Sequence, residues 1–243
     1  MRLAVGHLFP DYLNIYADRG NIAVLTRRAA WRGHELEVEA IGAGDSFRPG
    51  AHDLYYIGGG QDREQELIAP ALAAHGEALR EAVSGGAALL AVCGGYQLLG
   101  HSYRGHQGAE MPGIGLVDLV TEAGSTRMIG NIVLECELDA GDRRRLVGFE
   151  NHAGRTTLGA GLTPLGRVLS GHGNNGSDGG EGVHAGGIIG TYVHGPLLPK
   201  NPWLADWLIR RALAGGGSGE PLEPLDDALE LEAGRVAQAI AGA

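Results

Sequence analysis

The sequence is poor in cysteine, and its basic residues form no cluster. Its 243 residues include two cysteines, Cys93 and Cys136, and carry a formal net charge of −10. Two cysteines cannot build a disulfide framework, and their separation matches no zinc motif. The acidic balance argues against nucleic acid or an anionic membrane surface as the main partner. We therefore expect no bound metal and no nucleic-acid partner.

Long hydrophobic runs are missing too. No apolar run approaches the ~20 residues that span a bilayer. The opening residues, MRLAVGHLFPDYLN, hold too short an apolar run and no small-residue cleavage site for a signal peptide. We expect a soluble, cytoplasmic protein without membrane insertion. Glycine, by contrast, is abundant at 43 residues, and its spread through patterned segments indicates tight turns and not disorder.

Apolar patterns along the chain alternate between strand-like and helix-like segments. Strands are expected at 3–8, 35–41, 53–57, 87–92 and 187–193, and helices at 21–31, 65–83 (with a break near Gly76), 201–213 and 229–240. Strict alternation over 35–41 is typical of a half-buried edge strand, whereas the unbroken apolar run 87–92 indicates a strand covered on both faces. Residues 113–167 change to β segments and turns.

This order predicts an α/β fold, with a doubly wound, mostly parallel sheet and helices on both faces. We expect one domain over residues 1–213. Residues 214–243 begin with the glycine-rich stretch 214–219 and are expected to form a linker and a C-terminal helical appendage.

Cys93 stands where the apolar strand 87–92 meets a helix, in the stretch ALLAVCGGYQLLG. A sharp strand-to-helix turn lifts its central residue clear of the backbone, as in the nucleophile elbow, although Ala91 replaces the usual first glycine. The helix N-terminus would favour the thiolate. A buried core cysteine is the alternative. Cys136 fits that alternative, because it shares a face with apolar neighbours in NIVLECEL.

Two other segments end at the same predicted edge of the sheet. Strand 53–57 runs into three glycines at 58–60, and strand 187–193 runs into His194. Active sites of open α/β sheets lie at the carboxyl ends of the strands. Backbone N–H groups of Gly59, Gly60 and Gly94 could bind substrate and a developing oxyanion there. A plain glycine-rich turn is the alternative.

The other histidines are weaker candidates. His34, His52 and His75 occur in polar contexts that indicate the surface, whereas His152 in GFENHAGRT and His172 in GHGNNG are expected in loops and stay open as candidates. His194 alone has the strand-end placement that matches Cys93.

Taken together, the motifs resemble those of class I glutamine amidotransferases of the cobyric-acid-synthase-like (CobB/CobQ-type) branch. Within it they look most like the GatD-type glutaminase subunits of lipid II isoglutaminyl synthases. The matching stretches occur in the family's order and span most of the chain: IGGGQDREQ, VCGGYQLLG, GFENHAGRT, GHGNNGSDGGEG and GTYVHGPLLPKNP. The resemblance implies a flavodoxin-like fold and hydrolysis of L-glutamine to glutamate and ammonia.

The resemblance also implies roles for single residues. Cys93 would be the nucleophile and His194 its base, and Arg127 in GSTRMIGN would hold the substrate glutamine. A planar guanidinium suits an α-carboxylate, although a solvated loop arginine is the alternative. Many class I enzymes carry a glutamate two residues after the histidine, where this chain has Pro196. The third group is therefore open: none, an in-chain acid such as Asp18 or Glu150, or an acid from a partner.

A partner is implied as well. The chain has no phosphate-binding signature and needs no cofactor of its own, so ATP chemistry would occur on another chain. The resemblance implies a heterodimer with a MurT-like, ATP-dependent Mur-ligase subunit, which would amidate the D-glutamate α-carboxylate of the peptidoglycan stem peptide to D-isoglutamine. Three alternatives stay open: a cobyrinate-type acceptor, a stand-alone γ-glutamyl cysteine hydrolase, and a catalytically dead scaffold subunit.

Overall fold

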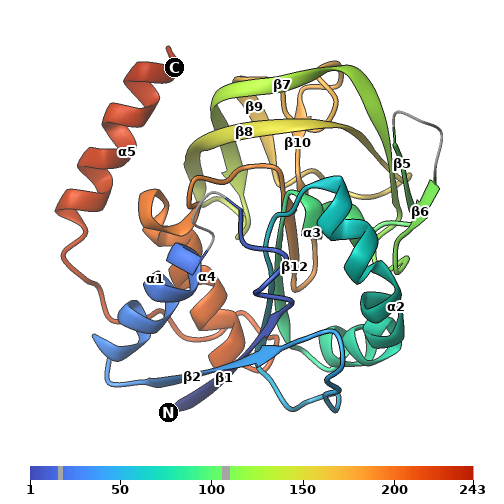
Figure 1. Ribbon diagram of the computed structural model, residues 1–243. Coiled ribbons are helices and arrows are strands. Elements are labelled where there is room, and N and C mark those ends of the chain that lie inside the picture. Colours follow the sequence, from blue (N-terminus) through green and yellow to red (C-terminus); the bar gives the residue numbers. More distant parts are fainter. Residues whose placement is uncertain (16–18, 106–109, 243) are drawn as a thin grey trace.

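The structure is a computed structural model that describes residues 1–15, 19–105 and 110–242 (Figure 1). Its centre is a six-stranded sheet with the order β11-β12-β4-β3-β1-β2. All neighbouring pairs are parallel except β11 and β12, which are antiparallel. The strands of this sheet are β1 (Arg2–Leu8), β2 (Glu35–Ile41), β3 (Leu54–Ile57), β4 (Ala88–Val92), β11 (Val183–Ala185) and β12 (Ile188–Thr191).

Helices lie on both faces of this sheet, with α1 and α4 on one face and α2 and α3 on the other (Figure 1). The helices are α1 (Arg19–Ala30), α2 (Asp62–Ser84), α3 (Gly94–Leu98), α4 (Pro202–Leu213) and α5 (Ala228–Ala241), with a 3-10 turn, η2, at Leu198–Lys200. The predicted doubly wound α/β fold is confirmed.

A second sheet follows α3 in the sequence and stands at one end of the first (Figure 1). Its order is β10-β9-β7-β5-β6, and β8 also pairs with β7. Its strands are β5 (Ser102–Arg104), β6 (Glu110–Pro112), β7 (Leu119–Glu137), β8 (Arg143–Leu158), β9 (Gly166–Ser170) and β10 (Gly180–Glu181). The expected β character of residues 113–167 is confirmed, and the long antiparallel pair β7–β8 dominates this part.

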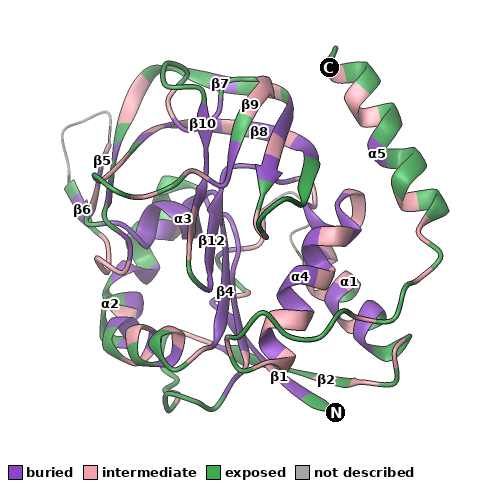
Figure 2. Ribbon diagram, turned by 180° about the vertical axis from the view of Figure 1, so that it is seen from behind, coloured by how far each residue is buried: buried purple, intermediate pink, exposed green. Residues whose placement is uncertain are grey.

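The middle strands of the first sheet are fully enclosed, as the continuous apolar runs predict. Every residue of β3, β4 and β12 is buried, and β4 and β12 lie side by side in the core (Figure 2). Burial of this apolar surface is the main force that holds the sheet between its helices. The carboxyl ends of β3, β4 and β12 are thereby fixed at one edge, which positions the residues that follow them.

Helix α2 differs from its prediction, because it does not break near Gly76. It runs unbroken from Asp62 to Ser84, with Pro70 and Gly76 both inside it. A helical glycine costs about 1 kcal/mol relative to alanine. Burial of the face that includes Leu72 and Leu79 offsets this cost. Gly76 packs beside Ile114, where a Cβ at position 76 would make an ordinary van der Waals contact at 3.4 Å.

Strand β2 has the predicted bounds and the predicted edge position, but it is less buried than its alternation indicates. Val38 is 42% exposed, and of the seven residues only Ile41 is fully covered. An edge strand pairs on one side only, here with β1, and little packs over its outer half.

Two histidines expected at the surface are in fact buried. The His75 ring packs between Phe9 and Phe47, and burial lowers its pKa. His52 Nε2 lies 2.8 Å from Glu39 Oε2, and its ring packs against Tyr55. For His75 the polar neighbours in the sequence were misleading, because Phe9 and Phe47 come from distant segments.

A buried arginine of α1 holds the segment that follows α4 in place. Arg28, 2% exposed, donates to both carboxylate oxygens of Asp206 and to both of Asp227. Asp227 immediately precedes α5, so this contact fixes where the last helix begins. The predicted helix at 229–240 is confirmed, and α5 exposes most of its surface (Figure 2).

Candidate active site

The joint between β4 and α3 has the geometry of an elbow. Strand β4 ends at Val92, helix α3 begins at Gly94, and Cys93 between them has φ 50° and ψ −109°. A positive φ is unusual for a residue with a side chain and marks local strain, which is common at functional sites. The Cys93 N–H donates to Thr191 O at 2.8 Å, which ties the elbow to the end of β12.

The glycines after Cys93 allow α3 to press against the glycine loop that follows β3. A Cβ on Gly94 would lie 2.9 Å from Gly60 O, and one on Gly95 would lie 2.8 Å from Gly58 O. The Gly95 N–H donates to Gly58 O at 3.2 Å. No larger residue fits at either position without moving the loop. This contact explains why two glycine-rich motifs distant in the sequence occur together in one chain.

A cavity of about 490 Å³ opens beside the elbow. It is lined by Gly60 of the glycine loop, by Cys93 and by Arg127, three residues singled out by sequence, and by His152. Cys93 is 8% exposed, so the thiol is enclosed but reached by this cavity. Gly59 lies beside the cavity, and its carbonyl accepts from the Ile15 N–H at 3.1 Å.

Arg127 enters the cavity from an irregularity in β7. The register of β7 with β8 shifts between Ala123 and Met128, and Arg127 lies in this interval. Such bulges redirect side chains. The guanidinium is oriented by Asn151, whose side-chain Oδ1 accepts from Nε at 2.8 Å and whose backbone O accepts from Nη2 at 2.9 Å.

His194 follows β12 as predicted but is deeply buried. Its backbone exchanges two hydrogen bonds with Phe149, at 2.9 and 3.1 Å, and its side chain is 0% exposed. Burial lowers the pKa of His194 to about 4, with a smaller lowering by His152 and an opposing effect of Glu150. The imidazole is therefore neutral at pH 7.

The structure thus gathers the predicted residues at one edge of the sheet, in two layers. Cys93, Gly60 and Arg127 line the cavity, whereas His194 is 0% exposed and is not among the lining residues. Cys93 and His194 follow neighbouring strands paired in parallel, with Thr191 opposite Val92, so both residues lie at the same edge of the sheet.

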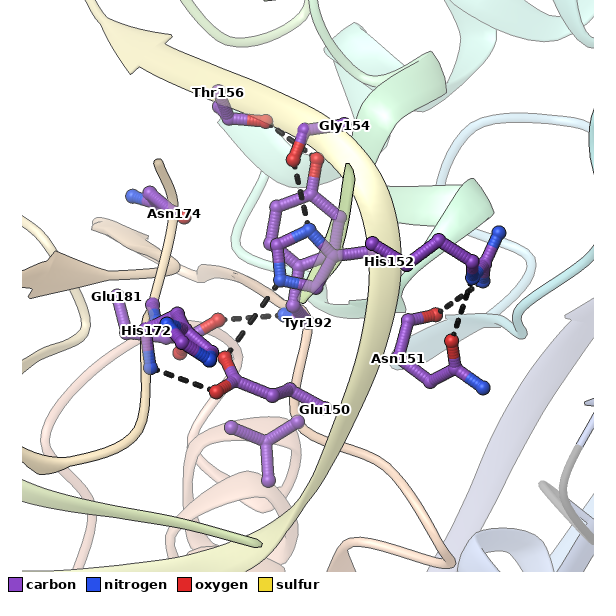
Figure 3. Close-up of polar contacts among 12 residues, drawn as sticks. Glu150, Asn151, His152, Gly154, Thr156, His172, Asn174, Glu181 and Tyr192 are labelled. Carbon is purple, nitrogen blue, oxygen red and sulfur yellow. Dashed lines mark hydrogen bonds and ion pairs between the residues drawn. The ribbon is translucent and has the colours of Figure 1, made fainter. Parts of the chain in front are cut away.

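His152 is a cavity residue whose setting sequence reasoning missed. It lies on β8 and not in a loop, and its ring stacks on Tyr192 with centroids 3.6 Å apart (Figure 3). Nδ1 is 2.8 Å from Gly154 O, and Nε2 is 3.7 Å from a carboxylate oxygen of Glu150. Alternate residues of β8 point inward, so this strand places polar groups in the interior. His172, in contrast, lies in the loop where it was expected.

Glu150 is fully buried beneath this ring. Its two carboxylate oxygens accept from the backbone N–H groups of His172 at 2.7 Å and Gly173 at 3.0 Å (Figure 3). Of the acids considered for a third catalytic group, Glu150 is therefore engaged in holding a loop, while Asp18 lies outside the described residues. Pro196, at the position where many class I enzymes carry a glutamate, packs against Gly20 at the start of α1.

A run of buried amides and hydroxyls supports the floor of the cavity. Gln65 donates to Gln97 at 3.0 Å, Gln97 donates to the Tyr192 hydroxyl at 3.1 Å, and that hydroxyl is 2.6 Å from Thr156 Oγ1. Buried polar networks of this kind rigidify a site when their members are satisfied. The hydroxyl of Tyr192, the ring on which His152 stacks, is thus held by Gln97 and Thr156.

The described part of the chain offers neither a metal site nor a membrane-spanning helix. No group of three or more histidine, cysteine, aspartate or glutamate side chains there is arranged to hold a metal ion. Among the described helices, none is long and apolar enough to cross a bilayer.

Comparison with known proteins identifies relatives over nearly the whole chain. The profile of the CobB/CobQ-like glutamine amidotransferase domain matches residues 4–202. The chain is 40% identical to the lipid II isoglutaminyl synthase (glutamine-hydrolyzing) subunit GatD of Staphylococcus aureus, covering 96% of this chain and 94% of that protein. It is 38% identical to the GatD subunit of Streptococcus pneumoniae, covering 87% and 81%. Cobyric acid synthase of Pelotomaculum thermopropionicum is 32% identical over 70% of this chain, but only 37% of that protein is covered.

Solved structures with low sequence identity share the fold. PurLQS from Thermotoga maritima superposes with a TM-score of 0.56 at 16% identity, covering 88% of this chain and 97% of the matched chain. The glutaminase domain of Trypanosoma brucei CTPS, solved with acivicin, gives 0.56 at 11% identity, covering 91% and 96%.

Proposed function

This chain belongs to the family of CobB/CobQ-like glutamine amidotransferases, and from that premise we propose that it is the glutaminase subunit of a lipid II isoglutaminyl synthase. As a member of this family it is a glutamine-hydrolysing enzyme. The single observation that supports the chemistry best is Cys93, held at a strained elbow and reached by a polar cavity.

In the proposed mechanism the Cys93 sulfur attacks the γ-amide carbon of L-glutamine. Neutral His194 accepts the thiol proton and then gives it to the departing amine, so that ammonia leaves and a glutamyl thioester remains. Water, deprotonated by His194, then cleaves the thioester to glutamate and restores the thiol. Burial keeps the His194 imidazole unprotonated at neutral pH, so in this proposal it starts each cycle as the free base.

The tetrahedral intermediates of both steps carry an oxyanion. Its proposed donors are the N–H of Gly94 and N–H groups of the glycine loop, which α3 presses close to Cys93. Losing one such donor typically costs about 3–4 kcal/mol of transition-state stabilisation. Arg127, oriented by Asn151, binds the substrate α-carboxylate in this proposal.

The relatives indicate the acceptor, and the chemistry of ammonia favours a partner subunit. Ammonia in neutral water is mostly protonated and not nucleophilic, so direct delivery to a second subunit is favoured. We propose a cytoplasmic heterodimer with a MurT-like, ATP-dependent ligase that forms D-isoglutamine in the peptidoglycan stem peptide. Identity of 40% to a GatD subunit, against 32% to a cobyric acid synthase, supports this acceptor over a cobyrinate-type one.

Ammonia release from L-glutamine by Cys93→Ala and His194→Ala tests the mechanism. Both variants should lose turnover, whereas Cys136→Ala should keep it, because Cys136 is a core residue 1% exposed. Near-normal release by either site variant would rule out the mechanism. Co-expression with the ligase subunit and size exclusion tests the heterodimer, and separate elution of the two chains would contradict it.

A further inference from the structure

Asp62 gives the cavity a negative charge that the mechanism above does not use. It is the first residue of α2, and it is the one carboxylate among the described residues that line the cavity with Cys93 and Arg127. The cavity therefore presents one carboxylate and two guanidinium groups, those of Arg63 and Arg127, beside the thiol.

Tyr103 holds this carboxylate in place. The Tyr103 hydroxyl lies 3.3 and 3.2 Å from the two oxygens of Asp62, and the tyrosine is 3% exposed. Burial, and next the charge of Asp62, raise the pKa of Tyr103, so the phenol keeps its proton and donates it to the carboxylate. Tyr103, Arg127 and Cys93 all line the same cavity.

Free glutamine carries a matching pair of charges at the end of the molecule opposite its amide. Its α-carboxylate requires a cation and its α-ammonium requires an anion or neutral acceptors. We propose that Asp62, oriented by Tyr103, binds the α-ammonium group of glutamine while Arg127 binds the α-carboxylate. Asp62 is then a specificity-determining residue that selects free glutamine over amides without a free α-amino group. This inference rests on the proposed glutaminase function.

A purely structural role for Asp62 makes a different prediction. An acidic residue in the first turn stabilises a helix through its dipole, and its loss would lower stability without changing substrate choice. The ratio of kcat/KM for two substrates that differ only in the α-amino group separates the two roles.

The test compares L-glutamine with 4-carbamoylbutanoate, which is glutamine without its α-amino group, in the full chain and in Asp62→Asn. Wild type should prefer glutamine. Asp62→Asn should raise KM for glutamine about 10-fold to 100-fold, with a smaller change in kcat, and leave 4-carbamoylbutanoate nearly unaffected. Tyr103→Phe should shift the same ratio in the same direction by less.

Glu66→Gln is the matched control. It removes the same charge one turn further along α2, from a residue that lines a neighbouring cavity with Asp62 and Tyr103 but not the cavity of Cys93. It should leave the substrate ratio unchanged. An unchanged ratio in Asp62→Asn, with glutamine still hydrolysed, would overturn this assignment alone. A wild-type chain that hydrolyses neither amide would overturn the proposed function and this assignment with it.

Discussion

The buried setting of His194 predicts an unusual pH dependence. Burial lowers the pKa of this imidazole from 6.5 to about 4. At pH 5.5 a histidine with an ordinary pKa would be about nine-tenths protonated, whereas His194 stays almost entirely neutral and able to act as a base. The acid limb of kcat/KM, which reports the free enzyme, should therefore fall at a pH below about 5.

The same lowering of the pKa makes the free energy of unfolding depend on pH. Between pH 6.5 and 4 the unfolded chain binds a proton at this histidine and the folded chain does not, so the contribution of His194 is complete above pH 6.5 and is lost as the pH falls through 4. A shift of this size corresponds to about 3 kcal/mol in total, of which about 2 kcal/mol is lost between pH 7 and pH 4.5.

Urea unfolding of wild type and His194→Gln at both pH values measures this contribution. The drop in the free energy of unfolding from pH 7 to pH 4.5 should be about 2 kcal/mol larger in wild type. His7, whose pKa burial also lowers to about 4, is present in both proteins and cancels. Equal drops in the two proteins, or an acid limb of kcat/KM near pH 6.5, would refute the reasoning.

Two further predictions concern the supports of the site. In Glu150→Gln, an amide N–H group faces the backbone N–H of His172 or Gly173, so one buried donor loses its acceptor. The free energy of unfolding should therefore fall by about 2–3 kcal/mol. An unchanged midpoint of urea unfolding would contradict the buried contacts. Gly94→Ala places a Cβ 2.9 Å from Gly60 O and must push α3 off the glycine loop. Ammonia release should then drop about tenfold or more through loss of oxyanion contacts, and wild-type turnover would contradict the assigned packing.

Most of the residues at the carboxyl edge of the first sheet could be predicted from the sequence, because the patterns that indicate them are local. A short continuous apolar run such as 87–92 between glycines favours a strand covered on both faces, and the glycines directly after Cys93 mark the sharp joint. The order of strands and helices then fixes which strand ends meet. Cys136 was also placed correctly, since its neighbours on β7 are apolar at every second position.

The interior of the second sheet could not be predicted in the same way. Strand β8 turns Glu150, His152 and Thr156 inward, so its buried face is polar and its pattern resembles that of a loop. These groups are stabilised by partners from distant segments, such as Tyr192, and sequence spacing does not reveal such pairs. The continuity of α2 through Gly76 depends in the same way on tertiary packing.

Covalent labelling tests the central claim most directly. The intact chain is treated with 6-diazo-5-oxo-L-norleucine, a glutamine-mimicking electrophile, with and without excess L-glutamine, and its peptides are analysed by mass spectrometry. We predict modification of Cys93 alone, suppressed by glutamine, while buried Cys136 stays unmodified. No adduct, an adduct on Cys136, or labelling of Cys93 that glutamine does not suppress would contradict a glutamine-binding site at the elbow.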